Sequence, residues 1–166
     1  MAMPNKSFAQ SNVLKINIFS PVVKTLNLSF EHVTSSTSSF QLGFFYTGYS
    51  VSDSKFSGFG ITPEYRFYLS ESSEAPDGFY VAPFVRYQSF KITDETTDSE
   101  GKLSGFGGGV IAGRHWIFKE KFSLDLFLGP AYYSGKTEVT SGSDSFDTDA
   151  FDGFGVRLGV TFGIAF

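Results

Sequence analysis

The chain has 166 residues, a net charge of −4, and 21 Phe, 8 Tyr and 18 Gly but no Cys. A chain of this length is typically one domain, the lack of Cys excludes disulfide frameworks and zinc–thiolate sites, and the negative charge does not favour nucleic-acid binding. An aromatic fraction of 18% is too high for a wholly disordered chain. Phe and Gly are abundant together at a mean hydropathy of −0.03, so composition alone does not separate a soluble from a membrane protein.

The first residues resemble the end of a secretory signal peptide. Ser7-Phe8-Ala9, followed by Gln10, has the small-x-small pattern of a cleavage site, although the apolar stretch that normally precedes it is missing. We therefore interpret residues 1–9 as a signal-peptide remnant or a disordered tail, and residues 10–166 as the folded domain.

The folded domain is predicted to consist of strands. Apolar residues alternate with a period of two, and no stretch of about 18 apolar residues predicts a transmembrane helix. Eight strand-like segments, separated by turn-like clusters, follow one another along the chain. They are Val13–Phe19, Lys24–Val33, Phe40–Val51, Gly58–Leu69, Phe79–Ile92, Leu103–Phe118, Phe122–Lys136 and Phe151–Phe166.

The last segment shows the alternation most clearly. Every second residue from Phe154 to Phe166 is apolar, whereas the residues between them are Gly, Thr, Ala and Arg157. Successive side chains of a strand point to opposite faces, so one face is wholly apolar and the other is small or polar. In a soluble barrel the apolar face points inward, whereas in an outer-membrane barrel it points outward to lipid and the polar face lines the lumen.

Three features favour the outer-membrane orientation. The polar faces are rich in Gly, which suits the narrow lumen of an eight-stranded barrel, while Phe mostly takes the apolar face. Away from the segment ends, Arg114 is the only charged side chain on the apolar faces, and a Lys or Arg at a bilayer midplane costs about 2–4 kcal/mol. Aromatic residues gather near segment ends, as in interfacial girdles. These are Phe67, Phe79, Tyr87, Trp116, Phe118, Tyr132 and Phe166.

An even number of strands places both ends of the domain on one side of the membrane, and the connections then sort into two groups. The expected periplasmic connections are Thr34–Ser39, Ser70–Gly78 and Lys119–Lys121. The expected outer connections are Ser20–Val23, Ser52–Lys55, Thr93–Lys102 and Thr137–Ala150. Pro63, Pro83 and Pro130 fall inside strands, where we expect bulges or widely spaced pairs because proline lacks an N–H donor.

Several stretches resemble a known family. They are GFGITPEYRFYL, GFYVAPFVRYQSF, GFGGGVIAGRHWIF, FSLDLFLGPAYY and GVRLGVTFGIAF. Over most of Asn12 to Phe166 the chain resembles a family of small outer-membrane β-barrel proteins of unknown function from Gram-negative bacteria. In architecture it is also similar to eight-stranded barrels of the small porin-like and adhesion-linked type. The resemblance implies a fold and a location, and it implies no activity.

Seven charged side chains are predicted to line the lumen. They are Lys15, Glu31, Glu64, Arg66, Arg86, Asp125 and Arg157. Buried charges must be paired and hydrogen-bonded, so we interpret the set as a polar plug that fills the lumen, with a diagonal Glu64–Arg86 pair. The alternative is a narrow channel for small solutes whose ring of charges selects them.

The sequence offers little support for catalysis or metal binding. His32 and His115 map near the periplasmic rim, and His32 is on the lipid-facing phase. No carboxylate is clearly placed beside either, although Asp125 is within reach of His115 across a hairpin. We predict no enzymatic activity, no cofactor and no metal site.

Two outer connections are acidic. Their acidic residues are Asp94, Glu95, Asp98 and Glu100 in the first, and Glu138, Asp144, Asp147 and Asp149 in the second. Such runs are usually solvated surface, and the alternative is a surface ligand or a weak divalent-cation site. The spacing lacks the Gly and the bidentate Glu of an EF-hand loop.

The sequence therefore predicts an all-β fold, an eight-stranded antiparallel transmembrane up-and-down β-barrel over residues 10–166, in the outer membrane. Its partners are the lipid bilayer and the outer-membrane barrel assembly machinery, which reads a last strand ending in Phe166. We expect a monomer with a structural or surface-interaction role. A soluble lipocalin-like ligand-binding barrel is the less favoured fold.

Overall fold

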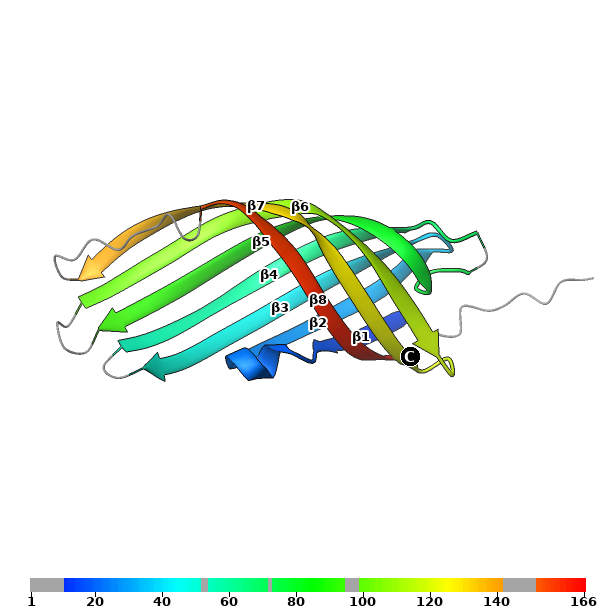
Figure 1. Ribbon diagram of the computed structural model, residues 1–166, viewed down its shortest axis with the longest axis horizontal. Helices are drawn as coiled ribbons and strands as arrows, with labels where there is room; N and C mark the ends of the chain where they lie inside the picture. The colour runs from blue at the N-terminus through cyan, green and yellow to red at the C-terminus, as the bar shows by residue number, and fades with distance from the viewer. Residues whose placement is uncertain (1–10, 52–53, 72, 95–98, 142–151) are drawn as a thin grey trace, which may run out of the picture.

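The computed structural model describes residues 11–51, 54–71, 73–94, 99–141 and 152–166. The predicted signal remnant and parts of both acidic connections lie outside these residues. Eight antiparallel strands follow one another around a closed barrel, and β8 pairs with β1 to complete it (Figure 1). The strands are β1 (Asn12–Asn17), β2 (Thr25–Ser35), β3 (Ser38–Val51), β4 (Ser54–Tyr68), β5 (Gly78–Asp94), β6 (Ser99–Phe118), β7 (Phe122–Ser141) and β8 (Gly153–Ala165). The predicted all-β, eight-stranded antiparallel barrel is confirmed.

The alternation of side chains places the apolar face on the outside of the barrel. On β8, Phe154 is 90% exposed and Leu158 is 67% exposed, whereas Thr161 and Ala165 are buried. The largest fully buried side chains include Arg66, Lys15 and other charged groups. This arrangement is the reverse of a soluble barrel, whose apolar side chains fill the interior.

The interior is packed by aromatic rings that lie over glycines of neighbouring strands. A Cβ atom added at Gly60 would lie 2.2 Å from the ring of Phe45, and one added at Gly159 would lie 2.4 Å from the ring of Phe127. Only glycine leaves room for a ring at these positions. The shared abundance of Phe and Gly therefore has a second cause besides the lipid-facing Phe residues: some Phe side chains point inward and pack on Gly.

The two ends of the described barrel meet. The backbone N–H of Asn12 donates to the carbonyl of Phe166 at 3.1 Å, and the N–H of Phe166 donates to the carbonyl of Asn12 at 2.9 Å. The β2–β3, β4–β5 and β6–β7 connections lie at this terminal end, and β3, β5 and β7 run toward the opposite end (Figure 1). The three connections predicted to be periplasmic therefore lie together at the terminal end.

The prolines inside strands cause no bulge. Pro63 faces Leu42, Pro83 faces Val110 and Pro130 faces Val156, and the registers run through all three positions without a shift. The register shifts lie instead between Val33 and Ser35 and between Glu100 and Gly101. The expectation of bulges at the prolines is therefore wrong. On one side of Pro63, pairing with β5 is interrupted for two residues, and on one side of Pro130, pairing with β6 is interrupted for two residues. The proline nitrogen, which has no hydrogen to donate, therefore needs no partner on that side.

The wall between β8 and β2 is only partly paired, because β1 is short. β1 ends at Asn17, two residues before the predicted end, and the chain turns into a 3-10 helix, η1 (Ser20–Val23), before Lys24 adopts a left-handed conformation with φ of 52°. Pairing with β1 stops at Thr161 of β8, whereas pairing with β7 continues to Gly153.

Among the described residues, no helix is long and apolar enough to cross a membrane.

Candidate functional site

A charged network fills the lumen near its terminal end. The inward positions of four strands supply its members: Lys15 of β1, Glu31 of β2, Glu64 and Arg66 of β4, and Asp125 of β7. Each of these side chains is fully buried. The strand alternation that places apolar residues outside therefore brings five charges into one enclosed space.

Arg66 is the centre of this network. Its Nε lies 2.6 Å from Oε1 of Glu64, and its Nη1 lies 2.7 Å from Oδ2 of Asp125 and 3.5 Å from Oε2 of Glu31. Lys15 adds a second cation, which contacts Glu31 and lies 3.1 Å from Oδ2 of Asp125. Three carboxylates thus share the two cations Lys15 and Arg66. Glu64 also binds a third cation, because Nη1 of Arg157 lies 2.8 Å from Oε2 of Glu64.

Hydroxyl groups satisfy the carboxylate oxygens that the cations leave open. Tyr68 donates to Oε1 of Glu31 at 2.6 Å, Tyr80 donates to Oδ1 of Asp125 at 2.8 Å, and the Ser39 hydroxyl also donates to Glu31. The guanidinium of Arg66 lies 4.2 Å from the centre of the Tyr80 ring. Buried ion pairs are stable only with such additional hydrogen bonds, so the tyrosines are as much part of the network as the charges.

The sequence reasoning missed His115, Tyr68 and Tyr80 as lumen residues. His115 is fully buried, with Nδ1 3.3 Å from the Tyr68 hydroxyl and 3.6 Å from Oε2 of Glu31. His115 therefore has two acidic neighbours. Glu31 is one, and Asp125, which stands opposite His115 on β7, is the other. All three missed residues share the inward phase of their strands, and that phase is the signal that would have found them. His32 lies outside, with Nδ1 2.8 Å from Oδ1 of Asn12.

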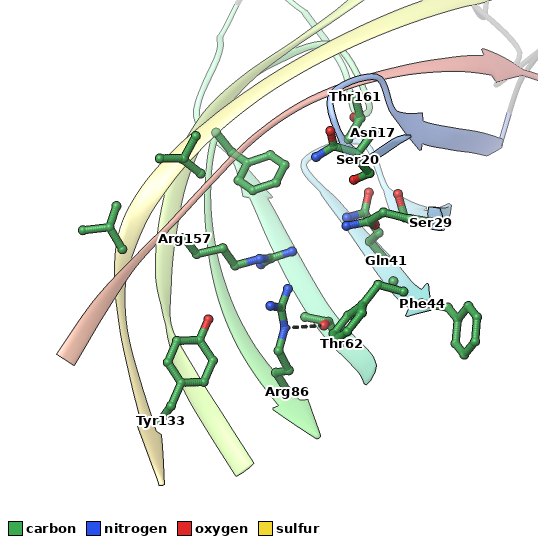
Figure 2. A pocket seen from close by; sticks show the side chains of 16 residues that line it. Asn17, Ser20, Ser29, Gln41, Phe44, Thr62, Arg86, Tyr133, Arg157 and Thr161 are labelled. Carbon is green, nitrogen blue, oxygen red and sulfur yellow. Dashed lines mark hydrogen bonds between the residues drawn. The ribbon is translucent and has the colours of Figure 1, made fainter. Parts of the chain in front are cut away.

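The predicted diagonal pair of Glu64 and Arg86 is wrong. Glu64 binds Arg66 and Arg157, whereas Nε of Arg86 donates to the Thr62 hydroxyl at 3.0 Å. Arg86 and Arg157 extend into a cavity of about 300 Å³ (Figure 2). The lumen thus has two levels, a charged network at the terminal end and a cavity on the other side of it.

The aromatic residues predicted for the membrane interfaces lie on the outer surface. Five are well exposed, and Tyr87 and Trp116 are partly buried against neighbours. The five are Phe67, Phe79, Phe118, Tyr132 and Phe166. Arg114 is covered rather than bare, because its guanidinium lies 4.8 Å from the Phe79 ring centre and 5.5 Å from that of Trp116.

The structure covers the acidic connections only at their edges. Glu100 pairs with Lys91 at 2.8 Å across β5 and β6. Glu95 and Asp98, and Asp144, Asp147 and Asp149, lie outside the described residues. Within the described ranges, no group of His, Asp and Glu side chains is arranged to hold a metal ion.

Comparison with known proteins places the chain in a family. Residues 1–149 match the model of a family described as "Protein of unknown function (DUF3575)". The chain belongs to this family. None of the curated proteins compared with the chain matches it.

One solved outer-membrane structure shares the fold. The N-terminal β-barrel domain of OprF from Pseudomonas aeruginosa aligns with a TM-score of 0.53 at 16% identity, over 95% of this chain and 98% of that one. A major outer membrane protein from Thermus thermophilus aligns with a TM-score of 0.49 at 17% identity, over 93% and 98%. The OprF likeness shows the fold, and with the family match it confirms the predicted resemblance to small barrels of unknown function.

Proposed function

We propose that the protein is an integral outer-membrane β-barrel with a plugged polar lumen and a structural or surface-interaction role. The observation that carries this proposal is the combination of a charged, extensively hydrogen-bonded interior with an apolar exterior. Water would have to cover the exposed Phe and Leu side chains of a soluble form. Lipid covers them without cost, and the likeness to the OprF barrel supports that environment.

The strand lengths suit this proposal. A transmembrane β-strand needs about 9–11 residues, and β2 to β8 have between 11 and 20. The outward aromatic residues near the strand ends would then form the interfacial girdles. The terminal end would face the periplasm, and the outward Phe166 beside β1 would be the group that the assembly machinery reads. The acidic connections would face outside as the surface available to a ligand.

Membrane insertion predicts a strict dependence on detergent or lipid. The purified protein is expected to stay monodisperse in a non-ionic detergent and to aggregate when the detergent is removed, because its outer surface is apolar. Light scattering during detergent removal measures this. Unheated samples should also migrate differently from boiled ones on a denaturing gel. A protein that stays monodisperse and monomeric in plain buffer would contradict insertion and favour the soluble barrel.

The plug predicts a closed lumen. In planar bilayers the wild-type protein is expected to give no steady channel conductance, because the charged network spans the lumen. Glu64→Ala should also stay closed and lose stability, since Arg66 and Arg157 lose their shared carboxylate. The measurements are single-channel recording and urea unfolding in vesicles. If Glu64→Ala conducts while its stability is unchanged, the alternative of a narrow channel for small solutes is correct.

A further inference from the structure

The short first strand leaves part of the barrel wall without a full strand. β1 has 6 residues, which at about 3.3 Å per residue and a tilt of about 40° cover roughly 15 Å of a hydrocarbon core about 30 Å thick. The neighbouring β8 has 13 residues. In a membrane-inserted barrel, the half of the seam away from the terminal end is therefore closed by the connection from Ile18 to Lys24.

That connection is apolar and weakly attached. Val22 is 81% exposed, and Phe19 and Val23 are each at least 60% exposed. One backbone hydrogen bond, from the N–H of Ile18 to the carbonyl of Val160 at 3.3 Å, joins it to β8 among the described residues. Side chains of this kind suit contact with lipid, and the few bonds allow the seam to part.

The lumen cavity reaches this seam. Its lining includes Asn17 and Ser20, at either side of the turn that leaves β1, and also Val156 and Leu158 of β8. The last two point to the outside of the barrel and are exposed. Figure 2 shows Asn17 and Ser20 at one end of the cavity and the two arginines in its middle. The cavity therefore reaches the edge of β8 that β1 leaves unpaired, in the wall between β8 and β2.

The chemistry inside the cavity suits an anion. The lumen holds the cations Lys15, Arg66, Arg86 and Arg157 against the carboxylates Glu31, Glu64 and Asp125. Arg86 is the cation with no carboxylate partner within the described residues, and it lies beside Arg157. Guanidinium groups bind carboxylates through paired, charge-assisted hydrogen bonds. An anion between Arg86 and Arg157 would neutralise the excess charge.

Two further polar groups point to a ligand. Oε1 of Gln41 and the hydroxyl of Thr161 are buried and have no hydrogen-bond partner among the described residues, and both residues line the cavity. Buried polar groups without partners are uncommon in native proteins. The Thr161 hydroxyl is able to donate to a bound anion, whereas Oε1 of Gln41 is an acceptor and would need a donor on the ligand or on a bound water.

We propose that the cavity binds the carboxylate of a fatty acid, held by Arg86 and Arg157, with the acyl chain leaving through the seam between β8 and β2. The volume of about 300 Å³ is at the small end of ligand sites, which suits a head group whose chain lies outside. The seam supplies the apolar exit, and the arginines supply the charge. This inference rests on the membrane insertion proposed above.

Native mass spectrometry of the protein released from non-ionic detergent tests the proposal with laurate as the probe. The wild-type protein is expected to retain one laurate. Arg86→Gln should weaken retention by at least about tenfold, because charge-assisted hydrogen bonds are lost. Arg114→Gln is the matched control, since Arg114 lies on the outer surface, and it should bind as the wild type does. Acetate and dodecyltrimethylammonium should give no adduct, because one lacks the chain and the other the negative charge.

A laurate analogue with a photoreactive tail locates the chain. Labelling is expected in residues 18–28 and 153–160, and Arg86→Gln should abolish it. Labelling spread evenly over the strands, or equal retention by Arg86→Gln and wild type, would overturn the proposal. Acetate binding as well as laurate would also overturn it, because a free carboxylate would then be the ligand. If the protein depends on detergent as expected but fails the laurate tests, the binding site is refuted and the proposed membrane insertion stands.

Discussion

Replacement of Arg66 by Met is expected to lower the free energy of unfolding by about 3–5 kcal/mol, the usual cost of removing one partner of a buried ion pair. Arg66 contacts Glu31, Glu64 and Asp125, and all of these side chains are fully buried. Without it, three carboxylates remain in an enclosed space with less positive charge. Urea unfolding in lipid vesicles, followed by the fluorescence of the single Trp116, measures the change.

Arg86→Met is the matched control for this variant. It also removes an inward arginine, but one bound to a hydroxyl of Thr62 rather than to a carboxylate, so we expect a change within about 1 kcal/mol. The double variant Arg66→Met with Glu64→Gln should lose less than the sum of the two single variants, because the residues interact directly. Equal losses for Arg66→Met and Arg86→Met would show that the network does not determine stability.

Replacement of Gly113 by Ala is expected to lower the free energy of unfolding by about 1–3 kcal/mol, as overpacking does in a filled interior. The new Cβ atom would lie 2.5 Å from the ring of Tyr80 and 2.6 Å from the backbone carbonyl oxygen of Leu126. The carbonyl is not free to turn away. Displacement of Tyr80 would also disturb its hydrogen bond to Asp125. The measurement is again unfolding in vesicles.

Gly155→Ala provides the comparison for the glycine variant. Its Cβ atom would lie 3.6 Å from the ring of Tyr133, which is ordinary van der Waals contact. We expect its unfolding midpoint to stay close to that of the wild type. If the two substitutions cost the same, the loss comes from changing glycine to alanine in a strand, and close ring packing is not its cause.

The barrel could be predicted from the sequence because its main constraint is local. Alternation with a period of two fixes which face each residue of a strand takes, and β8 shows it residue by residue from Phe154 onward. The inward placement of Lys15, Arg66 and Asp125 follows from the same rule. The rule needs no knowledge of which residues of neighbouring strands stand opposite one another.

The pairing of charges depends on more than alternation. Glu64 reaches Arg66 on its own strand and Arg157 on β8, across the lumen rather than to its neighbour β5. Such contacts depend on how the tilted strands are staggered around the closed barrel, and alternation does not encode that stagger. The early end of β1 was also missed, because Ile18 and Phe19 continue an apolar run although Pro21 marks a turn.

The two levels of the lumen separate the residues that hold the barrel together from those that line its free space. The ion pairs around Arg66 lie at one level, and Gln41, Thr62, Arg86 and Thr161 line the other. Substitutions at the second level leave the ion pairs of Arg66 intact. Evolution, or an engineer, is thus able to exchange the cavity lining for new specificities on an unchanged scaffold.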